Sequence, residues 1–322
     1  MIHPLDRFGA WWLRRGRGPA VFPDGWGNPD AVALLDVARH PISPPPPATI
    51  EWGRRWEVDG LVVEDGSFPT PADLPRAAHR VLVRRVAPAG GTRRSCLVMP
   101  AWNDEGFRGR TPFAVALARR GIGAFLLECP FYGSRRVHAD GPGIRSVAEF
   151  ALMGRAVVAE ALALVAATAD HGTVGVTGYS MGGNLAAFVG ALSPVDIAVA
   201  PLAASHSPGP VFCGGALRAG IRWDVFGGAD AEPRLAVALG SVSVLSLPPT
   251  PSTATAVLVA ARRDGFVPPT ATVELHRHWP GSELRWCPGG HGTSWWFRRR
   301  TLVDAVADAF ARVEAVAPPP RP

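Results

Sequence analysis

Val-Gly-Val-Thr-Gly-Tyr-Ser-Met-Gly-Gly-Asn, residues 174–184, carries the strongest structural signal in the chain. Residues 178–182 fit the pattern G-x-S-x-G, with a β-prone run before them and a helix-prone run, 184–192, after them. A nucleophile elbow requires this order of strand, sharp turn and helix. Such a turn lifts the Ser180 hydroxyl above the sheet and aims the Met181 N–H at the same point. We interpret Ser180 as a nucleophile; the alternative is a glycine-rich structural turn.

Strand-like and helix-like segments alternate on both sides of this turn. The alternation predicts an α/β-hydrolase fold, with a mainly parallel, doubly wound sheet and helices on both of its faces. Expected strands are 57–64, 80–86, 95–100, 123–128, 174–177, 197–200, 256–261 and 283–287. Expected helices are 31–39, 112–120, 145–169, 184–192, 270–279 and 294–316.

The alternation of strand-like and helix-like segments is absent from three parts of the chain, and these parts indicate how the chain is divided. Residues 1–50, rich in Trp, Pro and Gly, are expected to form an N-terminal extension packed on the core. The hydrolase domain is predicted over 51–317, with a small cap inserted at about 202–253, over the carboxyl ends of the strands. Residues 318–322 are expected to be a disordered tail because they are almost all proline.

The length of 322 residues allows one large α/β domain or two small ones, and a composition of 47% hydrophobic and 19% charged residues indicates an ordinary buried core and not disorder. The net charge of +6 comes from arginines scattered in pairs, without a nucleic-acid-binding motif, so we expect no nucleic-acid partner. Residues 151–169 are interrupted by Gly154, Arg155 and Glu160, which predicts a buried helix and no membrane span. Four cysteines without a C-x-x-C pair argue against a zinc or redox site and suit a reducing cytoplasm, and no secretory signal is visible.

The partners that Ser180 would need follow later strands. In this fold the order is Ser, then acid, then His. Asp264 comes just after the strand expected at 256–261, and His291 lies in a glycine-rich loop after 283–287. His291 would take the Ser180 proton, and Asp264 would hold the imidazole tautomer. Alternatively, Asp264 merely caps a helix and His291 is an ordinary loop residue.

An oxyanion hole needs two preorganised N–H donors. Met181 would supply one. The second is expected from the loop after the strand at 95–100, where Trp102 is our first choice and Asn103 our second.

Candidate substrate contacts flank these loops. Adjacent Arg135 and Arg136 would hold a phosphate or carboxylate, unless salt bridges use them to fix their own loop. His206 would line the acyl pocket, or else be a plain cap residue. The remaining two candidates are Tyr132 and Tyr179. Residues 11–15, Trp-Trp-Leu-Arg-Arg, either pack on the core or contact a membrane surface peripherally.

The motifs together resemble those of the alpha/beta-hydrolase domain-containing protein 18 family, from residue 25 to the last helix. Its most distinctive part here is Pro-Phe-Tyr-Gly-x-Arg-Arg at 130–136; the others are at 25–29, 65–68, 150–154, 177–183, 264–268, 279–281 and 289–291. The resemblance implies the same triad and hydrolysis of an ester or lipid ester. Where the family has Gly-Thr-Gly-Asp, this chain has residues 101–104, Ala-Trp-Asn-Asp, so the Trp102 side chain would narrow the acyl pocket.

These observations predict a serine hydrolase that cleaves a carboxylic ester, with a small-molecule or lipid ester as substrate, through an acyl-enzyme on Ser180. No metal or organic cofactor is implied. An acyltransferase or thioesterase would use the same acyl-enzyme. A hydrolase fold kept as a non-catalytic binding module is the alternative from a different class.

Overall fold

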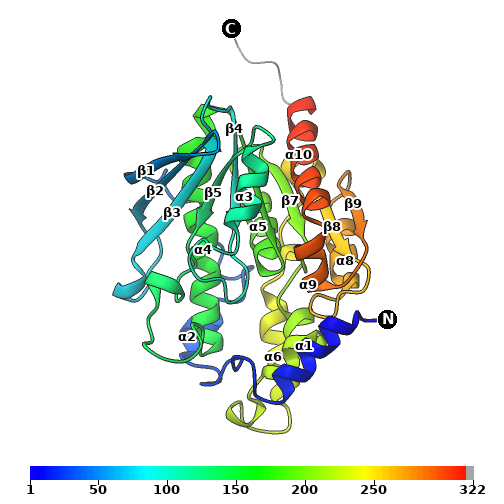
Figure 1. Cartoon of the computed structure of the whole chain (residues 1–322). Coiled ribbons are helices and arrows are strands. Elements are labelled where there is room, and N and C mark those ends of the chain that lie inside the picture. Colours follow the sequence, from blue (N-terminus) through cyan, green and yellow to red (C-terminus); the bar gives the residue numbers. More distant parts are fainter. Residues whose placement is uncertain (317–322) are drawn as a thin grey trace.

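The computed structural model describes residues 1–316, and within them one nine-stranded sheet forms the centre of the fold (Figure 1). Its spatial order is β1-β2-β3-β5-β4-β6-β7-β8-β9. Strand β1 pairs antiparallel with β2, β2 with β3, and β3 with β5. From β5 to β9 in this spatial order, including β4, neighbouring strands pair parallel with each other, so the sheet is mainly parallel as predicted. The bounds are β1 Glu51–Val58, β2 Leu61–Pro69, β3 Arg80–Pro88, β4 Arg94–Met99, β5 Gly123–Leu127, β6 Thr173–Tyr179, β7 Ala198–Leu202, β8 Val257–Ala261 and β9 Glu283–Cys287.

The antiparallel edge differs from the prediction. The single strand expected at 57–64 is two strands, β1 and β2, which turn at Asp59-Gly60. Both turn residues have positive φ, 50° and 73°. An Asp-Gly pair with positive φ at both positions closes a tight two-residue hairpin, whose twist matches that of the flanking strands. The prediction was wrong here because it ran the alternating pattern through this turn.

Helices cover both faces of the sheet. Helices α3 (Thr111–Ala118) and α10 (Arg299–Val316) pack on one face (Figure 1). Helices α4 (Val147–Thr168), α5 (Met181–Leu192) and α8 (Pro269–His278) share the hydrophobic core of the other face. The helix expected at 294–316 is broken at Arg298 into α9 (His291–Phe297) and α10. The shorter helices are α2 (Pro29–Ala33) and α7 (Pro251–Ala254).

Helix α4 is the most apolar long helix of the fold. Among the described residues, Val147–His171 is the one stretch long and apolar enough to cross a membrane by length and composition alone, and 67% of its most apolar window is buried inside the fold. The core helix of a soluble protein passes the same test. The structure therefore uses this segment as a core helix, packed beside α5.

Two segments far apart in sequence meet beyond the carboxyl ends of the parallel strands. Helix α1 (Pro4–Arg14) packs on the short turn Ala216–Gly220, and the Val21 N–H donates to the Gly220 carbonyl at 2.9 Å. The stretch between β7 and β8 also contributes helix α6 (Ala231–Ser241) to this end of the molecule (Figure 1). We call α1 and this turn, together with α9, the rim. The last six residues of the chain, including the tail expected at 318–322, lie outside the described residues.

Candidate functional site

The turn between β6 and α5 has the strained geometry of an elbow. Ser180 has φ 59° and ψ −119°, a conformation that L residues adopt only when their surroundings impose it. The glycines on either side have no room for a side chain. A Cβ on Gly178 would lie 2.4 Å from the Gly182 carbonyl carbon, and one on Gly182 would lie 2.6 Å from the Met99 oxygen. The chain thus crosses itself closely enough to present the Ser180 side chain at the end of the sheet.

Asp264 and His291 lie side by side at the ends of β8 and β9. His291 Nδ1 is 2.7 Å from Asp264 Oδ2. The other carboxylate oxygen accepts the N–H groups of Phe266, at 2.9 Å, and Val267, at 2.8 Å. These bonds fix the buried Asp264 side chain in one orientation, so its remaining oxygen is aimed at the imidazole.

The electrostatic surroundings of His291 favour its protonated form. Burial by itself lowers the pKa of this imidazole, but the Asp264 carboxylate beside it and, more weakly, Asp6 outweigh that effect. The net result is a pKa above the ordinary histidine value. With Nδ1 facing Asp264, Nε2 is the ring atom free to accept a proton.

Asp6, on α1, is a site residue that the sequence did not reveal. Its Oδ2 accepts the backbone N–H of His291 at 2.7 Å and that of Gly265 at 2.9 Å. The carboxylate is buried and bridges the two loops that carry Asp264 and His291. No local spacing signals this role, because its bonding partners lie more than 250 positions away in the chain.

Tyr179 was expected to contact substrate, and the structure gives it a holding role as well. Its hydroxyl donates to the His291 carbonyl oxygen at 2.6 Å, and its ring centre lies 5.0 Å from the imidazole centre. It also lines the cavity described below. The backbone of His291 is therefore fixed from both sides, at its N–H by Asp6 and at its carbonyl by Tyr179.

The loop after β4 carries Trp102 and Asn103, the two alternatives for the second oxyanion donor. Trp102 and Asn103 line the same cavity as Ser180, and Asn103 adopts a φ of 59°. Within residues 1–316, the N–H groups of Met181, Trp102 and Asn103 donate to no protein acceptor. Free N–H groups at such a position are available to an oxyanion.

Arg110 secures that loop and was not anticipated. Its buried guanidinium donates to the Val98 carbonyl at 2.6 Å and to the Leu127 carbonyl at 2.7 Å, and it pairs with Asp104. These bonds tie the loop to the ends of β4 and β5. The ion pair between Arg110 and Asp104 follows no helix or strand periodicity from which the sequence could have predicted it.

A cavity of about 690 Å³ opens beside Ser180 and is mostly apolar. The rim supplies one wall, through Trp12, Leu217 and Trp296, and the loop after β4 supplies the other, through Trp102 and Asn103. A much smaller cavity of about 40 Å³ is also lined by both Ser180 and Trp102. The Trp102 indole, packed edge-on against Phe22 and Phe212, thus borders both spaces.

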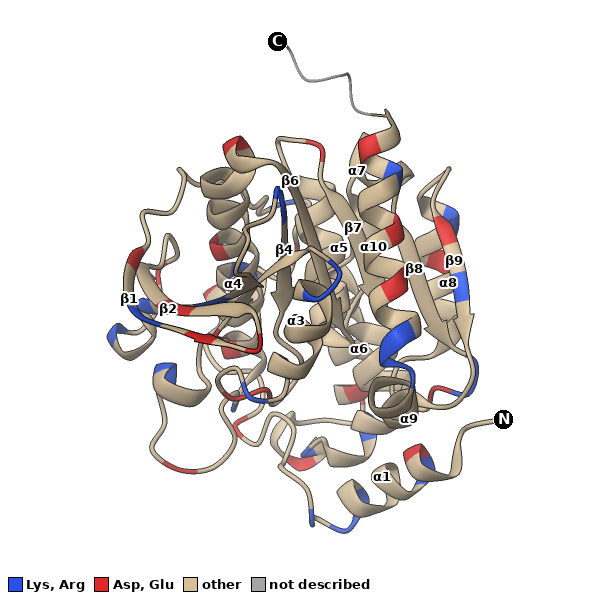
Figure 2. Ribbon diagram, turned by 45° about the horizontal axis from the view of Figure 1, so that its top comes forward, with Lys and Arg blue, Asp and Glu red and all other residues tan. Residues whose placement is uncertain are grey.

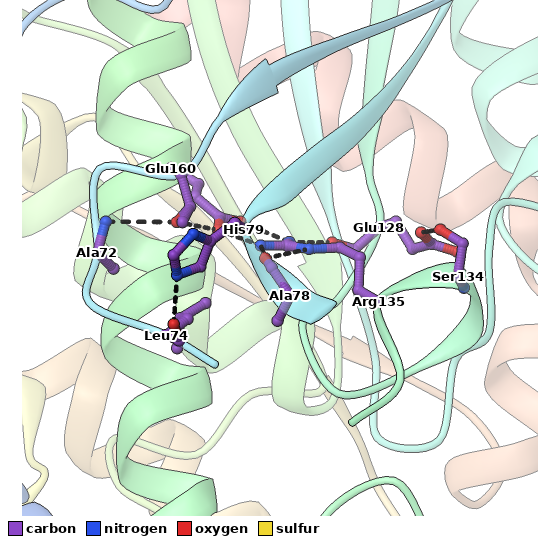
Figure 3. Close-up of polar contacts among 9 residues, drawn as sticks. Ala72, Leu74, Ala78, His79, Glu128, Ser134, Arg135 and Glu160 are labelled. Atoms are coloured by element: carbon purple, nitrogen blue, oxygen red, sulfur yellow. Dashed lines mark hydrogen bonds and ion pairs between the residues drawn. The ribbon is translucent and has the colours of Figure 1, made fainter. Parts of the chain in front are cut away.

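Arg135 does not line the cavity, so the prediction that it binds a phosphate or carboxylate of the substrate was wrong. Its guanidinium pairs with Glu160 on α4 at 2.6 Å, and both side chains are at most 1% exposed (Figure 3). It also donates to the carbonyls of Ala78, at 2.7 Å, and Glu128, at 2.8 Å. A guanidinium whose donors are used inside the core cannot bind a substrate anion, so Arg135 is the anchor of its own loop.

Three other candidates lie outside the cavity within the described residues. Arg136 donates to Glu105 at 2.5 Å and to the Gly141 carbonyl. These contacts agree with the alternative interpretation, in which Arg136 fixes its own loop. Tyr132 is buried, with its hydroxyl 3.4 Å from the Asn103 side chain. His206 lies 3.0 Å from Glu274 and 3.2 Å from the Ser243 hydroxyl, and burial lowers its pKa against the opposing effect of Glu274. None of the three reaches Ser180, so the expected substrate contacts are replaced by structural ones.

The part of the chain that the structure describes contains no group of three or more His, Cys, Asp or Glu side chains close enough to hold a metal ion. Its four cysteines are all free thiols. Ser180 and His291 line the same cavity, His291 contacts Asp264, and the three residues occur in the chain order Ser, Asp, His.

Solved structures of esterases share the fold at low sequence identity. Acetyl xylan esterase 1 of a Thermoanaerobacterium species matches with a TM-score of 0.57 and 17% identity, over 98% of this chain and 100% of that one. An acetyl xylan esterase of a Paenibacillus species matches at 0.56 and 14%, over 92% and 99%. Brefeldin A esterase, a bacterial homologue of human hormone-sensitive lipase, matches at 0.55 and 15%, over 98% and 94%.

A family model covers most of the sequence. The model described as alpha/beta hydrolase domain containing 18 matches residues 20–234 and 230–312. The mostly parallel sheet, the elbow at Ser180 and the loops after β8 and β9 all fall within the matched ranges. The chain therefore belongs to the alpha/beta hydrolase domain containing 18 family.

Proposed function

We propose that this protein hydrolyses carboxylic esters through an acyl-enzyme formed on Ser180. The observation that carries the proposal is the contact of 2.7 Å between His291 and a buried Asp264, at a cavity that Ser180 also lines. The esterase folds among its structural neighbours and its family membership support the same reaction class.

The proposed reaction has two stages, acylation of Ser180 and hydrolysis of the acyl-enzyme. Ser180 Oγ attacks the ester carbonyl carbon while His291 Nε2 takes the hydroxyl proton, and Asp264 stabilises the resulting imidazolium. The N–H groups of Met181 and Trp102 bind the oxyanion. Collapse of the tetrahedral intermediate breaks the bond to the alcohol, which leaves with the proton from His291. Water then repeats the sequence on the acyl-enzyme, releasing the carboxylic acid and restoring Ser180.

The cavity supports a substrate larger than an acetyl ester of a small alcohol. A space of about 690 Å³ is within the range that holds drug-sized ligands. Its apolar lining favours an acyl chain or another apolar group over a charged one. Because Arg135 and Arg136 are engaged elsewhere, neither supports a requirement for a phosphate on the substrate.

The test is Ser180→Ala in an assay with p-nitrophenyl esters, paired with labelling by a fluorophosphonate probe. Turnover and labelling should both disappear. Ser193→Ala, at the opposite end of α5, is the matched control and should retain both. Labelling that survives Ser180→Ala would rule out the proposed nucleophile. Adding a competing alcohol or a thioester to the intact enzyme separates hydrolysis from acyl transfer and thioesterase activity.

A further inference from the structure

The rim exposes a cluster of large apolar side chains. On α1, Phe8 is 55% exposed and Trp11 40%; on α9, Trp296 is 68% exposed and Phe297 75%. We call Leu5, Phe8, Trp11, Trp12, Trp296 and Phe297 the aromatic rim. Helices α1 and α9 pack against each other, so these residues belong to neighbouring elements. Exposed apolar clusters of this kind usually mark an interaction surface.

The two sides of helix α1 differ: one side packs on the core, and the other presents apolar side chains to the solvent. Asp6 and Gly9 face the core, where Asp6 bonds to the His291 loop and a Cβ on Gly9 would lie 3.0 Å from the Phe266 ring. Leu5 and Phe8 face outward, and Phe8 stacks on Trp11 at 5.5 Å. The outward side is therefore apolar without serving the fold.

Arginines surround this apolar surface. Arg7, Arg14, Arg15, Arg17, Arg298 and Arg299 are exposed, and within residues 1–316 none of them forms an ion pair. Two of them lie over the aromatic rings, Arg15 at 4.8 Å from Trp11 and Arg17 at 5.5 Å from Trp12. Figure 2 shows basic segments along α1 and again at the end of α9. The acidic residue of α1, Asp6, is buried and does not offset this charge at the surface.

The same surface contributes residues to the lining of the large cavity. Trp12, Arg17 and Trp296 belong both to this region and to the cavity lining. A flat partner seated on the rim would therefore lie against residues that also line the cavity containing Ser180. Unpaired positive charge beside exposed tryptophan and phenylalanine favours a partner that is negatively charged at its surface and apolar just beneath it.

We propose that the rim docks on the surface of an anionic lipid bilayer, with the aromatic rim inserted at the level of the head groups and the arginines on lipid phosphates. Each arginine near such a surface contributes about a fivefold gain in affinity, and the gain is screened by salt. The docking proposal rests on the proposed function only for its purpose, which is to let an acyl ester pass from the bilayer into the cavity.

Vesicle co-sedimentation with the Ser180→Ala protein tests docking separately from chemistry. The protein should pellet with vesicles of phosphatidylcholine and phosphatidylglycerol, and much less with phosphatidylcholine alone or in about 1 M salt. Phe8→Ser/Phe297→Ser and Arg14→Glu/Arg15→Glu should each weaken binding at least tenfold. The matched controls are Val237→Ser, an exposed apolar residue on α6, and Arg54→Glu/Arg55→Glu on β1; both should bind as the parent does.

Three results would overturn the proposal. The parent protein fails to bind anionic vesicles, or the control variants lose binding as much as the rim variants, or light scattering shows a dimer that Phe8→Ser/Phe297→Ser converts to a monomer. The last result would assign the surface to a second copy of the chain. In protein that keeps Ser180, the rim variants should hydrolyse soluble p-nitrophenyl acetate at the parent rate. Vesicle binding without any esterase activity would leave docking intact and remove the proposed function.

Discussion

Two carboxylates reach His291 from opposite regions of the molecule. Asp264 comes from the loop after β8 and contacts the imidazole, whereas Asp6 comes from the rim and contacts the backbone N–H. The first belongs to the sheet region, where Ser180 directly follows β6 and Asp264 lies just after β8. The second belongs to a region assembled from three segments that lie far apart in the chain, namely α1, the turn Ala216–Gly220 and α9. The difference suggests that the sheet sets the chemistry and the rim sets its position and access.

The largest expected effect is on the sheet side of this comparison. Asp264→Asn should lower kcat/KM for a p-nitrophenyl ester by roughly 10⁴, because the amide favours the wrong imidazole tautomer. Steady-state kinetics at neutral pH measures it. Asp6→Asn keeps an oxygen that can accept both N–H groups and should cost far less. Equal losses in the two variants would break the distinction between the regions.

The next largest effect concerns Arg135, inside the sheet region. Arg135→Met leaves the buried Glu160 carboxylate without a cationic partner and should destabilise the fold by about 3–5 kcal/mol. Urea unfolding provides the measurement. Arg136→Met, next in the chain but partly exposed, should cost at most about 1 kcal/mol. If replacing both Arg135 and Glu160 with Met does not recover most of the loss, the buried pair is not its cause.

Trp102 borders both cavities beside Ser180. We expect it to determine which acyl chains fit the site more than the maximal rate of hydrolysis. Trp102→Ala joins the small cavity to the large one, and the added space should favour esters about two methylenes longer by roughly tenfold relative to acetyl esters. The ratio of kcat/KM values across a p-nitrophenyl ester series measures this. Trp286→Ala, on β9 and away from both cavities, serves as the control. An unchanged ratio would mean that the acyl chain does not pass Trp102.

The smallest effect is a shift in pH dependence. Because the pKa of His291 is raised, kcat/KM should fall on the acid side with a midpoint above the ordinary histidine value, where the base becomes protonated. Among the described residues, the titratable groups close to this imidazole are Asp264 on its loop, Asp6 on α1 and Tyr179 on β6, and the apolar Phe266 ring packs beside it. Asp6→Asn removes one negative charge and should move the midpoint to lower pH with little loss of maximal rate. Movement to higher pH, or none, would contradict this assignment.

Sequence reasoning was strongest where local chemistry determines structure. The strand, turn and helix around Ser180 and the parallel sheet follow from short patterns, and the fold prediction is confirmed. It failed at the Asp59-Gly60 hairpin, where one expected strand is two. Arg135 shows the deeper limit: a solvent-facing arginine and a buried one look identical in sequence, and only Glu160, 25 positions away on α4, decides which it is.

The bond from Asp6 to the His291 backbone joins positions 285 apart in the chain, and this separation has a consequence for synthesis. Residues of α1 leave the ribosome long before the loops after β8 and β9 exist. During that interval the helix has neither of its carboxylate's partners, and its apolar outer side is already accessible. The proposed site therefore becomes complete only in the closing stage of translation, so a nascent chain carries the segment proposed to dock on a membrane before it carries the assembled site.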